Sequence, residues 1–154
     1  MQINIEAFGV TELDRTIVRV SERAEDMRPV WVVLHKRFVE MERRQFSSQG
    51  ISAGGWRPLT PATIARKAQM GLDTQIMHAT HRLRDSLTRT GHADHVYRPR
   101  KDEVFFGTRV PYAGPHQRPR SSNPLPQRRL VAFTESERRE WVKAIQRYIV
   151  TGRA

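Results

Sequence analysis

Six histidines are the residues of this chain that come nearest to the parts of a metal site. His78 and His81 lie one helical turn apart, and His92 and His95 follow closely. Imidazole nitrogens bind divalent metals, and Asp85 or Asp94 could supply the acidic ligand of a site that activates water. The spacing matches no named zinc motif, however, and scattered surface histidines would give the same pattern. A metal-dependent nuclease is therefore an open but less favoured hypothesis.

Other constellations that carry catalysis are missing from the sequence. The chain has no cysteine, no glycine-rich phosphate loop and no G-x-S-x-G nucleophile motif. We therefore predict a protein that is not an enzyme, with no catalytic residue, no cofactor and no bound metal.

Basic residues surround three aromatic residues in the second half of the chain. Arginine and lysine bind phosphates, and bases stack on aromatic rings, so this combination suits nucleic acid. Arginines also serve protein interfaces well, so nucleic-acid binding is an alternative hypothesis and no more. The rings are Tyr97, Phe105 and Tyr112, and the basic residues near them are Arg98, Arg100, Lys101, Arg109, Arg118, Arg120, Arg128 and Arg129.

Length and charge limit the classes of protein to consider. The 154 residues fit a single domain, which we expect to span residues 1–154. The net charge of +11 favours an acidic partner, which could be nucleic acid, a membrane surface or an acidic protein face. We find no signal-peptide pattern and no run of about 18 apolar residues, and expect a non-secreted protein without a membrane partner. The absence of cysteine fits assembly in a reducing cytoplasm.

Hydrophobic periodicity predicts an α+β fold, with several helices packed on one small antiparallel β-sheet and a long basic loop. Thr134 and Glu137 form a capping box that starts the last helix. Phe105 and Phe106 are neighbours in a strand and should face opposite sides. Strands are predicted at residues 2–8, 93–98, 103–108 and 130–133, and helices after Thr11, from Pro29, from Pro61 to Met70, from about Thr74 to Thr88, and after Thr134.

Two segments rich in turn-forming residues interrupt these elements. Residues 47–56 and 111–127 are predicted to be surface extensions, and residues 151–154 a frayed tail. Segment 111–127 is basic and rich in proline and serine, and it lies between two predicted strands. The predicted core contains Trp31, Phe38, Trp141 and Ile145.

Several motifs follow one another in an order that resembles a known family. They are Trp56 to Pro61 with Thr63 and Lys67, the leucine-and-serine segment Ile76 to Thr88, the strand end FFGTRVPYAGPHQ, and LPQRRLVAFTESERREW. Over about residues 30–150 the chain resembles the phage virion morphogenesis, or tail completion, family, which includes the G protein of Mu-like phages. There are two departures. Thr80-His81 replaces the usual Thr-Gly pair, and Arg118-Pro119 replaces the glycine that often follows the His-Gln pair.

The resemblance implies a structural virion protein that acts in tail completion and head–tail joining, at the neck or tail terminator, after assembly in the host cytoplasm. It also implies a homo-oligomeric ring, six-fold as in proteins of that location, that contacts other neck and tail proteins and lies close to DNA. Such a ring requires a heterologous interface between copies. The residues predicted to make subunit or partner contacts are Tyr112, His116, Gln117, Arg118, Arg120, Arg128 and Arg129.

Overall fold

A long central helix, α2 (Arg28–Ser47), organises the computed structural model, which describes residues 10–118 and 125–154. Its 20 residues span about 30 Å. The strand predicted at residues 2–8 lies outside the described residues. The other elements are α1 (Val10–Glu25), a 3₁₀ turn at Ile51–Ala53, α3 (Pro61–Gln69), α4 (Arg82–Thr88), β1 (His95–Pro99), β2 (Val104–Thr108), α5 (Ala113–Gln117) and α6 (Glu135–Thr151).

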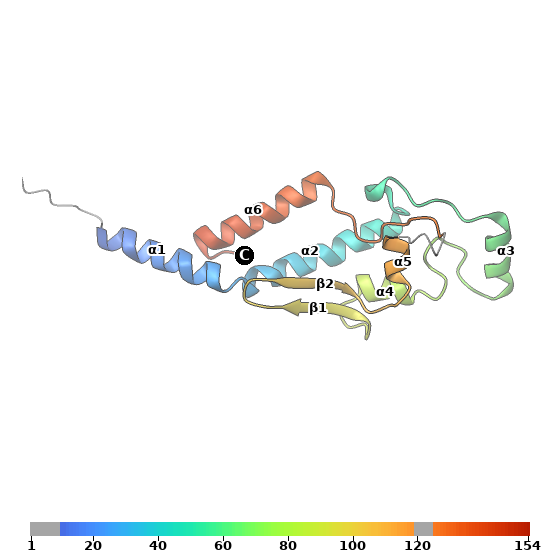
Figure 1. Ribbon diagram of the computed structural model, residues 1–154, viewed down its shortest axis with the longest axis horizontal. Helices are drawn as coiled ribbons and strands as arrows, with labels where there is room; N and C mark the ends of the chain where they lie inside the picture. The colour runs from blue at the N-terminus through green and yellow to red at the C-terminus, as the bar shows by residue number, and fades with distance from the viewer. Residues whose placement is uncertain (1–9, 119–124) are drawn as a thin grey trace, which may run out of the picture.

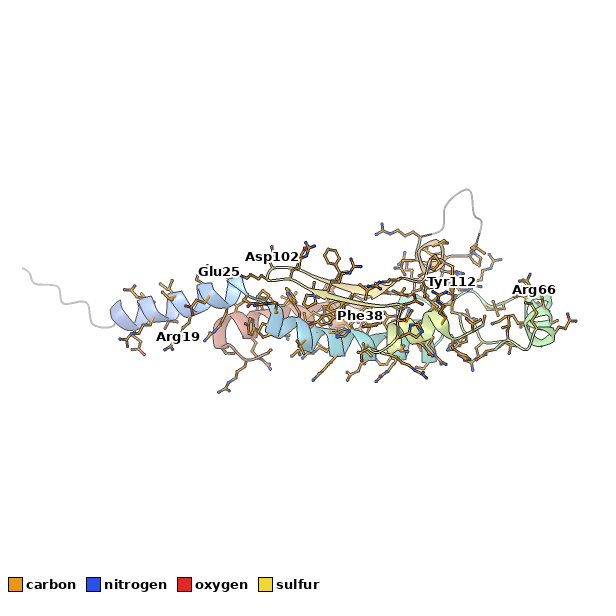
Figure 2. The ribbon with its side chains drawn as sticks, turned by 90° about the horizontal axis from the view of Figure 1, so that it is seen from below. Arg19, Glu25, Phe38, Arg66, Asp102 and Tyr112 are labelled. Carbon is orange, nitrogen blue, oxygen red and sulfur yellow. The ribbon has the colours of Figure 1, made fainter. Side chains whose placement is uncertain are left out.

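The described chain is elongated, with α1 at one end and α3 at the other (Figure 1). Side chains show the same arrangement, because Arg19 of α1 and Arg66 of α3 lie near opposite ends of the long axis (Figure 2). Between these ends, α4, α6 and the β1–β2 hairpin all contact α2. None of the described helices is long and apolar enough to cross a membrane.

The core consists of two clusters strung along α2. One is built around Phe38, Phe46 and Leu83, and the other around Trp31 and Leu34. Phe106 and Trp141 pack against both clusters and so join them. Of the predicted core residues, Trp31 and Phe38 are buried, whereas Trp141 and Ile145 are partly buried and pack against these clusters.

The predicted hairpin is present, and in the described residues it is the whole sheet. Tyr97 pairs with Phe106 across the antiparallel strands. Phe105 is 51% exposed while Phe106 packs into the core, which confirms that they face opposite sides. Trp31 Nε1 donates to the Arg100 carbonyl at 2.9 Å, and this bond ties the hairpin turn to the start of α2.

Stacked rings hold the hairpin along α2. The ring centroids of His35 and Tyr97 lie 4.0 Å apart, and the two rings are nearly parallel. His35 and His95 also join through their Nε2 atoms at 2.7 Å. Because His95 Nδ1 lies 2.8 Å from the carbonyl of Ser86, which can only accept, this Nδ1 carries the hydrogen and His95 Nε2 accepts from His35. Burial and the neighbouring His95 lower the pKa of His35, which favours this neutral arrangement.

The prediction of a helix from about Thr74 is wrong in its start, because α4 begins only at Arg82. The Asp73 carboxylate accepts a hydrogen bond from the Gln75 backbone N–H at 2.8 Å, which starts a turn. Met77 and His81 then adopt φ values of 65° and 59°, in the left-handed region that a helix does not tolerate. His81 occupies the position where the resemblance places a glycine, so the glycine-type turn persists with a histidine in it.

The strand predicted at residues 130–133 is also wrong, since these residues form no ladder with another strand. Their hydrogen-bond partners are side chains, as described below. Segment 111–127, predicted as an extension throughout, contains the short helix α5. The predicted capping box of α6 is confirmed: Thr134 Oγ1 accepts from the Glu137 N–H, and the Glu137 carboxylate accepts from the Thr134 N–H.

The segment between α2 and α3 folds back onto the core at Trp56. Gly50 has a φ of 82°, and a Cβ on it would lie 2.3 Å from Trp56 Cδ1. Glycine is therefore required at this position both for conformation and for space. Trp56 is buried and packs edge-on against Phe46.

Glu42 of α2 is fully buried, and neither of its carboxyl oxygens has a hydrogen-bond partner in the described chain. Burial, with a smaller effect from the Glu137 charge, raises the pKa of Glu42 well above 4.5. The folded chain therefore keeps a proton on Glu42 at pH values where the unfolded chain releases it.

We expect Glu42→Gln to raise the melting temperature at pH 7, and the advantage to disappear near pH 4. Between the unfolded-state and the folded-state pKa of Glu42, the native chain loses about 1.4 kcal/mol of unfolding free energy for each unit by which the pH rises. Glutamine does not titrate, so the variant does not have this loss. Thermal unfolding followed by circular dichroism from pH 4 to pH 8 tests this. Glu40→Gln, at an exposed position of α2, is the matched control and should change little. An equal rise in melting temperature at every pH would contradict the raised pKa of Glu42.

Candidate docking surface

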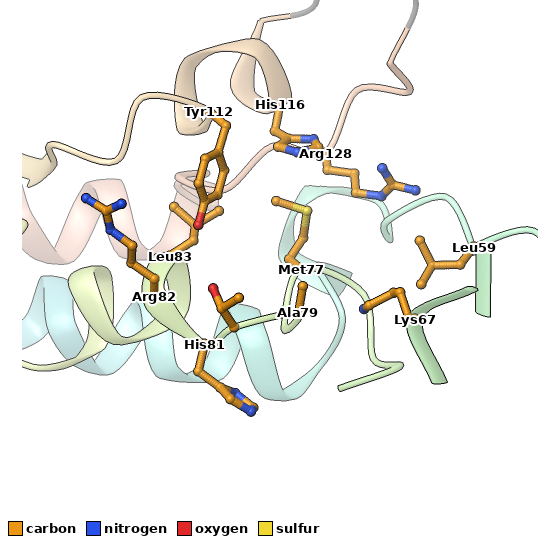
Figure 3. Close-up of a pocket in the computed structure, with 11 residues that line it drawn as sticks. Leu59, Lys67, Met77, Ala79, His81, Arg82, Leu83, Tyr112, His116 and Arg128 are labelled. Atoms are coloured by element: carbon orange, nitrogen blue, oxygen red, sulfur yellow. The ribbon is translucent and has the colours of Figure 1, made fainter. Parts of the chain in front are cut away.

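A cavity of about 730 Å³ opens between α3, α4 and α5. Side chains from four separate parts of the chain converge on it (Figure 3). Leu59, Met77 and Leu83 give it an apolar wall, and Tyr112, which is 42% exposed, stands at its edge. The other lining residues are Lys67, Ala79, Thr80, His81, Arg82, His116 and Arg128.

Local structure explains how these residues reach the cavity. Thr60 caps α3 by accepting a hydrogen bond from the Thr63 N–H at 3.2 Å, and Pro61 follows at the first helical position. This helix brings Lys67 to the cavity. The left-handed turns at Met77 and His81 reverse the chain ahead of α4. The N-terminal end of α5 supplies Tyr112, and the segment before α6 supplies Arg128.

Two buried cations give the cavity its positive charge. Lys67 Nζ donates to the Gln75 carbonyl at 2.7 Å, and the Arg128 guanidinium donates to the Arg57 carbonyl at 3.1 and 3.3 Å. Within the described chain neither cation forms a salt bridge to a carboxylate. Burial lowers the pKa of Lys67, with the Asp73 charge opposing the shift and Arg128 adding to it. Burial and the Arg57 charge likewise lower the pKa of Arg128.

Two histidines of the cavity have unused nitrogen atoms. The Nδ1 atoms of His81 and His116 are buried and have no hydrogen-bond partner in the described chain. His81 Nε2 approaches the Asp73 carboxylate at 3.5 Å. Burial and the neighbouring Arg128 charge lower the pKa of His116, so an anion in the cavity would favour its protonated form. The cavity thus combines apolar walls with cations suited to an acidic, partly apolar partner.

Gln117 fixes the position of the segment that carries Arg128. Its Oε1 accepts hydrogen bonds from the Leu130 and Val131 N–H groups at 2.7 and 3.0 Å, and its Nε2 donates to the Val131 carbonyl at 2.8 Å. Gln45 and Trp56 both donate to the Arg129 carbonyl, at 3.0 and 2.9 Å. Side chains therefore do here what a neighbouring strand would do in a sheet.

The structure brings some of the predicted contact residues together and uses others inside the fold. Tyr112, His116 and Arg128 line the cavity, and Arg118 is exposed nearby, after the end of α5. Arg129 is exposed, while its carbonyl serves the internal contact just described. The Gln117 side chain is occupied within the chain. Arg120 lies outside the described residues. That these residues contact a partner remains a prediction.

The residues weighed for other chemistry are dispersed. In residues 10–118 and 125–154 no group of three or more histidine or acidic side chains is placed to hold a metal ion. His95 is engaged with His35, and Asp94 forms an ion pair with Arg82 at 2.6 Å. Of the three rings considered for stacking on bases, Tyr97 belongs to the stack on α2, whereas Phe105 and Tyr112 are exposed.

Sequence reasoning did not find Lys67, Met77 and Arg82 as parts of one site. A signal for Lys67 existed, because it belongs to the motif that follows Trp56, but its burial was not visible in the pattern. Met77 was expected inside a helix. Only the left-handed turns place its side chain at the cavity.

We expect Gln117→Ala to destabilise the fold by about 2–4 kcal/mol, since it leaves three partly buried backbone groups without partners. Gln127→Ala is the matched control. Gln127 is exposed and donates one bond, to the Gln117 carbonyl at 3.0 Å, so its loss should change stability by less than about 0.5 kcal/mol. Urea unfolding of both variants measures the difference. Equal stability of the two variants would show that the Gln117 contacts do not hold this segment.

Comparison with known proteins assigns the chain to a group. Searches of curated proteins and of solved structures returned no significant match. The model of the phage virion morphogenesis family matches residues 9–149, which covers α1 to α6 almost completely. The match also includes every lining residue of the cavity and the whole of the central helix. This chain therefore belongs to the phage virion morphogenesis family.

Proposed function

We propose that this protein completes the phage tail and takes part in joining it to the head, as a non-enzymatic structural subunit of the neck or tail terminator. It works as a homo-oligomeric ring, six-fold by family resemblance, whose subunits dock on one another and on other neck and tail proteins. The docking surface is the basic cavity with its exposed edge at Tyr112 and Arg118.

The observation that carries this proposal is the cavity itself, in a member of a virion morphogenesis family. Its cations Lys67 and Arg128 are buried without a carboxylate partner in the described residues. Such charges cost stability, and an acidic partner would offset that cost on docking. Its apolar wall would bury aliphatic side chains, which is how protein interfaces obtain most of their affinity. A protein partner with acidic and apolar side chains fits both features.

We expect Tyr112→Ala combined with Arg118→Ala to lower the yield of infectious phage at least about tenfold, since losing about 1.4 kcal/mol of docking energy has that effect. The test supplies variants from a plasmid to a phage with a nonsense mutation in this gene. Electron microscopy should then show filled heads and tails that are not joined.

Val32→Ala is the control for this experiment. Val32 is an exposed apolar residue of α2 that does not line the cavity, and its variant should restore normal yield. Normal particles from the double variant would contradict the proposed surface. Particles whose heads and tails are joined but which are not infectious would contradict the proposed role in head–tail joining.

Binding of nucleic acid is the second candidate, and the outer face of the hairpin favours it. Arg98 pairs with Phe105 across the two strands, and both side chains are exposed. An exposed ring beside an arginine can stack on a base while the arginine contacts phosphate. The net charge of +11 would add to the attraction.

If this candidate is correct, labelled single-stranded DNA should bind at low salt, with an affinity that falls steeply as salt increases. Phe105→Ala should weaken binding by about 1–3 kcal/mol, the contribution of one base stacked on a ring. Fluorescence anisotropy measures both effects. Ile64→Ala, at an exposed apolar position of α3, should have no effect. Absence of binding at low salt would remove this candidate.

A further inference from the structure

Half of helix α1 has no partner within the described chain. Its C-terminal part is attached to the body, because Arg23 donates to the Ile149 and Val150 carbonyls at the end of α6. Its N-terminal part extends beyond α6 (Figure 1). There the side chains of Leu13 and Ile17 are 60% and 56% exposed. Because residues four apart share one face of a helix, the two side chains lie next to each other. This pair is an apolar patch that the monomer does not bury.

The charge of α1 differs from that of the rest of the chain. The helix holds three arginines and four acidic residues, a net charge of −1 in a chain of net charge +11. Glu12 and Asp14 lie beside Leu13 in the sequence. The free part of α1 also holds Arg15 and Arg19, so it is neutral overall, and its two carboxylates lie on either side of Leu13 in the sequence.

The cavity has the complementary character. Its wall of Leu59, Met77 and Leu83 is apolar, and the cations Lys67 and Arg128 have no carboxylate partner in the part of the chain that the structure describes. A cavity of this volume falls within the range of roughly 300–1,000 Å³ that encloses small ligands, so it can accept two aliphatic side chains. The buried Nδ1 atom of His116 adds a polar group without a hydrogen-bond partner in the described chain.

We propose that Leu13 and Ile17 of one copy insert into the cavity of a second copy, with Glu12 and Asp14 facing Lys67 and Arg128. This inference rests on the proposed function and names the contact between subunits. The N-terminal part of α1 with Leu13 and Ile17, here called the arm, and the cavity between α3, α4 and α5 lie toward opposite ends of the long axis (Figures 1 and 2), so the contact is head-to-tail. Repetition of such a contact closes into a ring, or continues as a filament when the rotation does not close.

Another groove, on α6, is a weaker receptor for the arm. It measures about 280 Å³ and offers the single apolar side chain Val142. Arg139 beside it already approaches Glu135 at 3.5 Å, so part of its positive charge is compensated. The larger cavity provides both the apolar wall and two buried cations that form no salt bridge within the described chain.

The decisive experiment mixes two variants that each lack one side of the contact. Leu13→Asp with Ile17→Asp removes the arm, and Tyr112→Glu places a negative charge at the cavity edge. All three positions are exposed, so both variants should fold, which circular dichroism verifies. By native mass spectrometry the wild-type protein should form oligomers. Each variant alone should associate at least about 100-fold more weakly, as expected when two aliphatic side chains lose their burial.

An equimolar mixture of the two variants should form a heterodimer with twice the mass of the 17.9 kDa chain, and nothing larger. Each pair then has one intact arm and one intact cavity. Pairing of α1 with α1 predicts instead that Tyr112→Glu, whose α1 is intact, forms homodimers by itself and that the mixture contains no heterodimer, which would overturn the proposal. Val142→Asp is the control for the α6 groove and should oligomerise normally. Its failure to do so, or a monomeric wild-type protein, would also overturn the proposal.

These measurements use purified protein, so they are independent of the phage assay. If no heterodimer forms, but phage yield still depends on Tyr112 and Arg118, only the contact of α1 with the cavity is contradicted. A normal heterodimer with no effect on head–tail joining would remove the proposed function instead.

Discussion

The candidate docking surface depends on one partly buried stretch of backbone, residues 128–131. Leu130 is in the core, yet no strand runs alongside, and unpaired buried amide groups would cost about 1–3 kcal/mol each. Gln45 of α2, Trp56 and Gln117 of α5 supply the missing hydrogen-bond partners. Because these three side chains come from distant parts of the chain, the same bonds fix α5 relative to α2 and hold Arg128 in the cavity wall.

The charge of the cavity follows from that arrangement. Arg128 is buried because the residues after it are tied to the core, and a backbone carbonyl, that of Arg57, accepts from its guanidinium. Lys67 is likewise buried and donates to a carbonyl. Carbonyl groups satisfy the hydrogen bonds of a cation but do not neutralise it, so the positive potential remains available to an anionic group. Two of the 27 basic residues behind the net charge of +11 are thus desolvated together at this cavity.

The elongated shape separates this surface from the part of α1 that lacks a partner. A second set of contacts, the stack of His35, Tyr97 and Phe106 with the hydrogen bond from His35 to His95, holds the hairpin along α2. It also withdraws Tyr97 and His95 from the surface, where they had suggested base stacking and metal binding. What is left exposed at the two ends is therefore a helix end with the aliphatic Leu13 and Ile17 beside two carboxylates, and a basic, apolar cavity. Membership of a virion morphogenesis family gives this complementarity its biological context.

Features whose causes are local could be read from the residues alone. The start of α3 at Pro61, the capping box at Thr134, the hairpin with Phe105 and Phe106 on opposite faces, and the family itself all followed from neighbouring residues or their order. Tertiary contacts decided the rest. Met77 and His81 adopt left-handed conformations that their residue types disfavour, and Gln117, expected to meet a partner, bonds with Leu130 and Val131 inside the chain. Leu130 to Phe133 has the composition of a strand, but its bonding partners are side chains from elsewhere in the chain. Periodicity records which residues prefer to be buried, whereas only the folded chain determines what they are buried against.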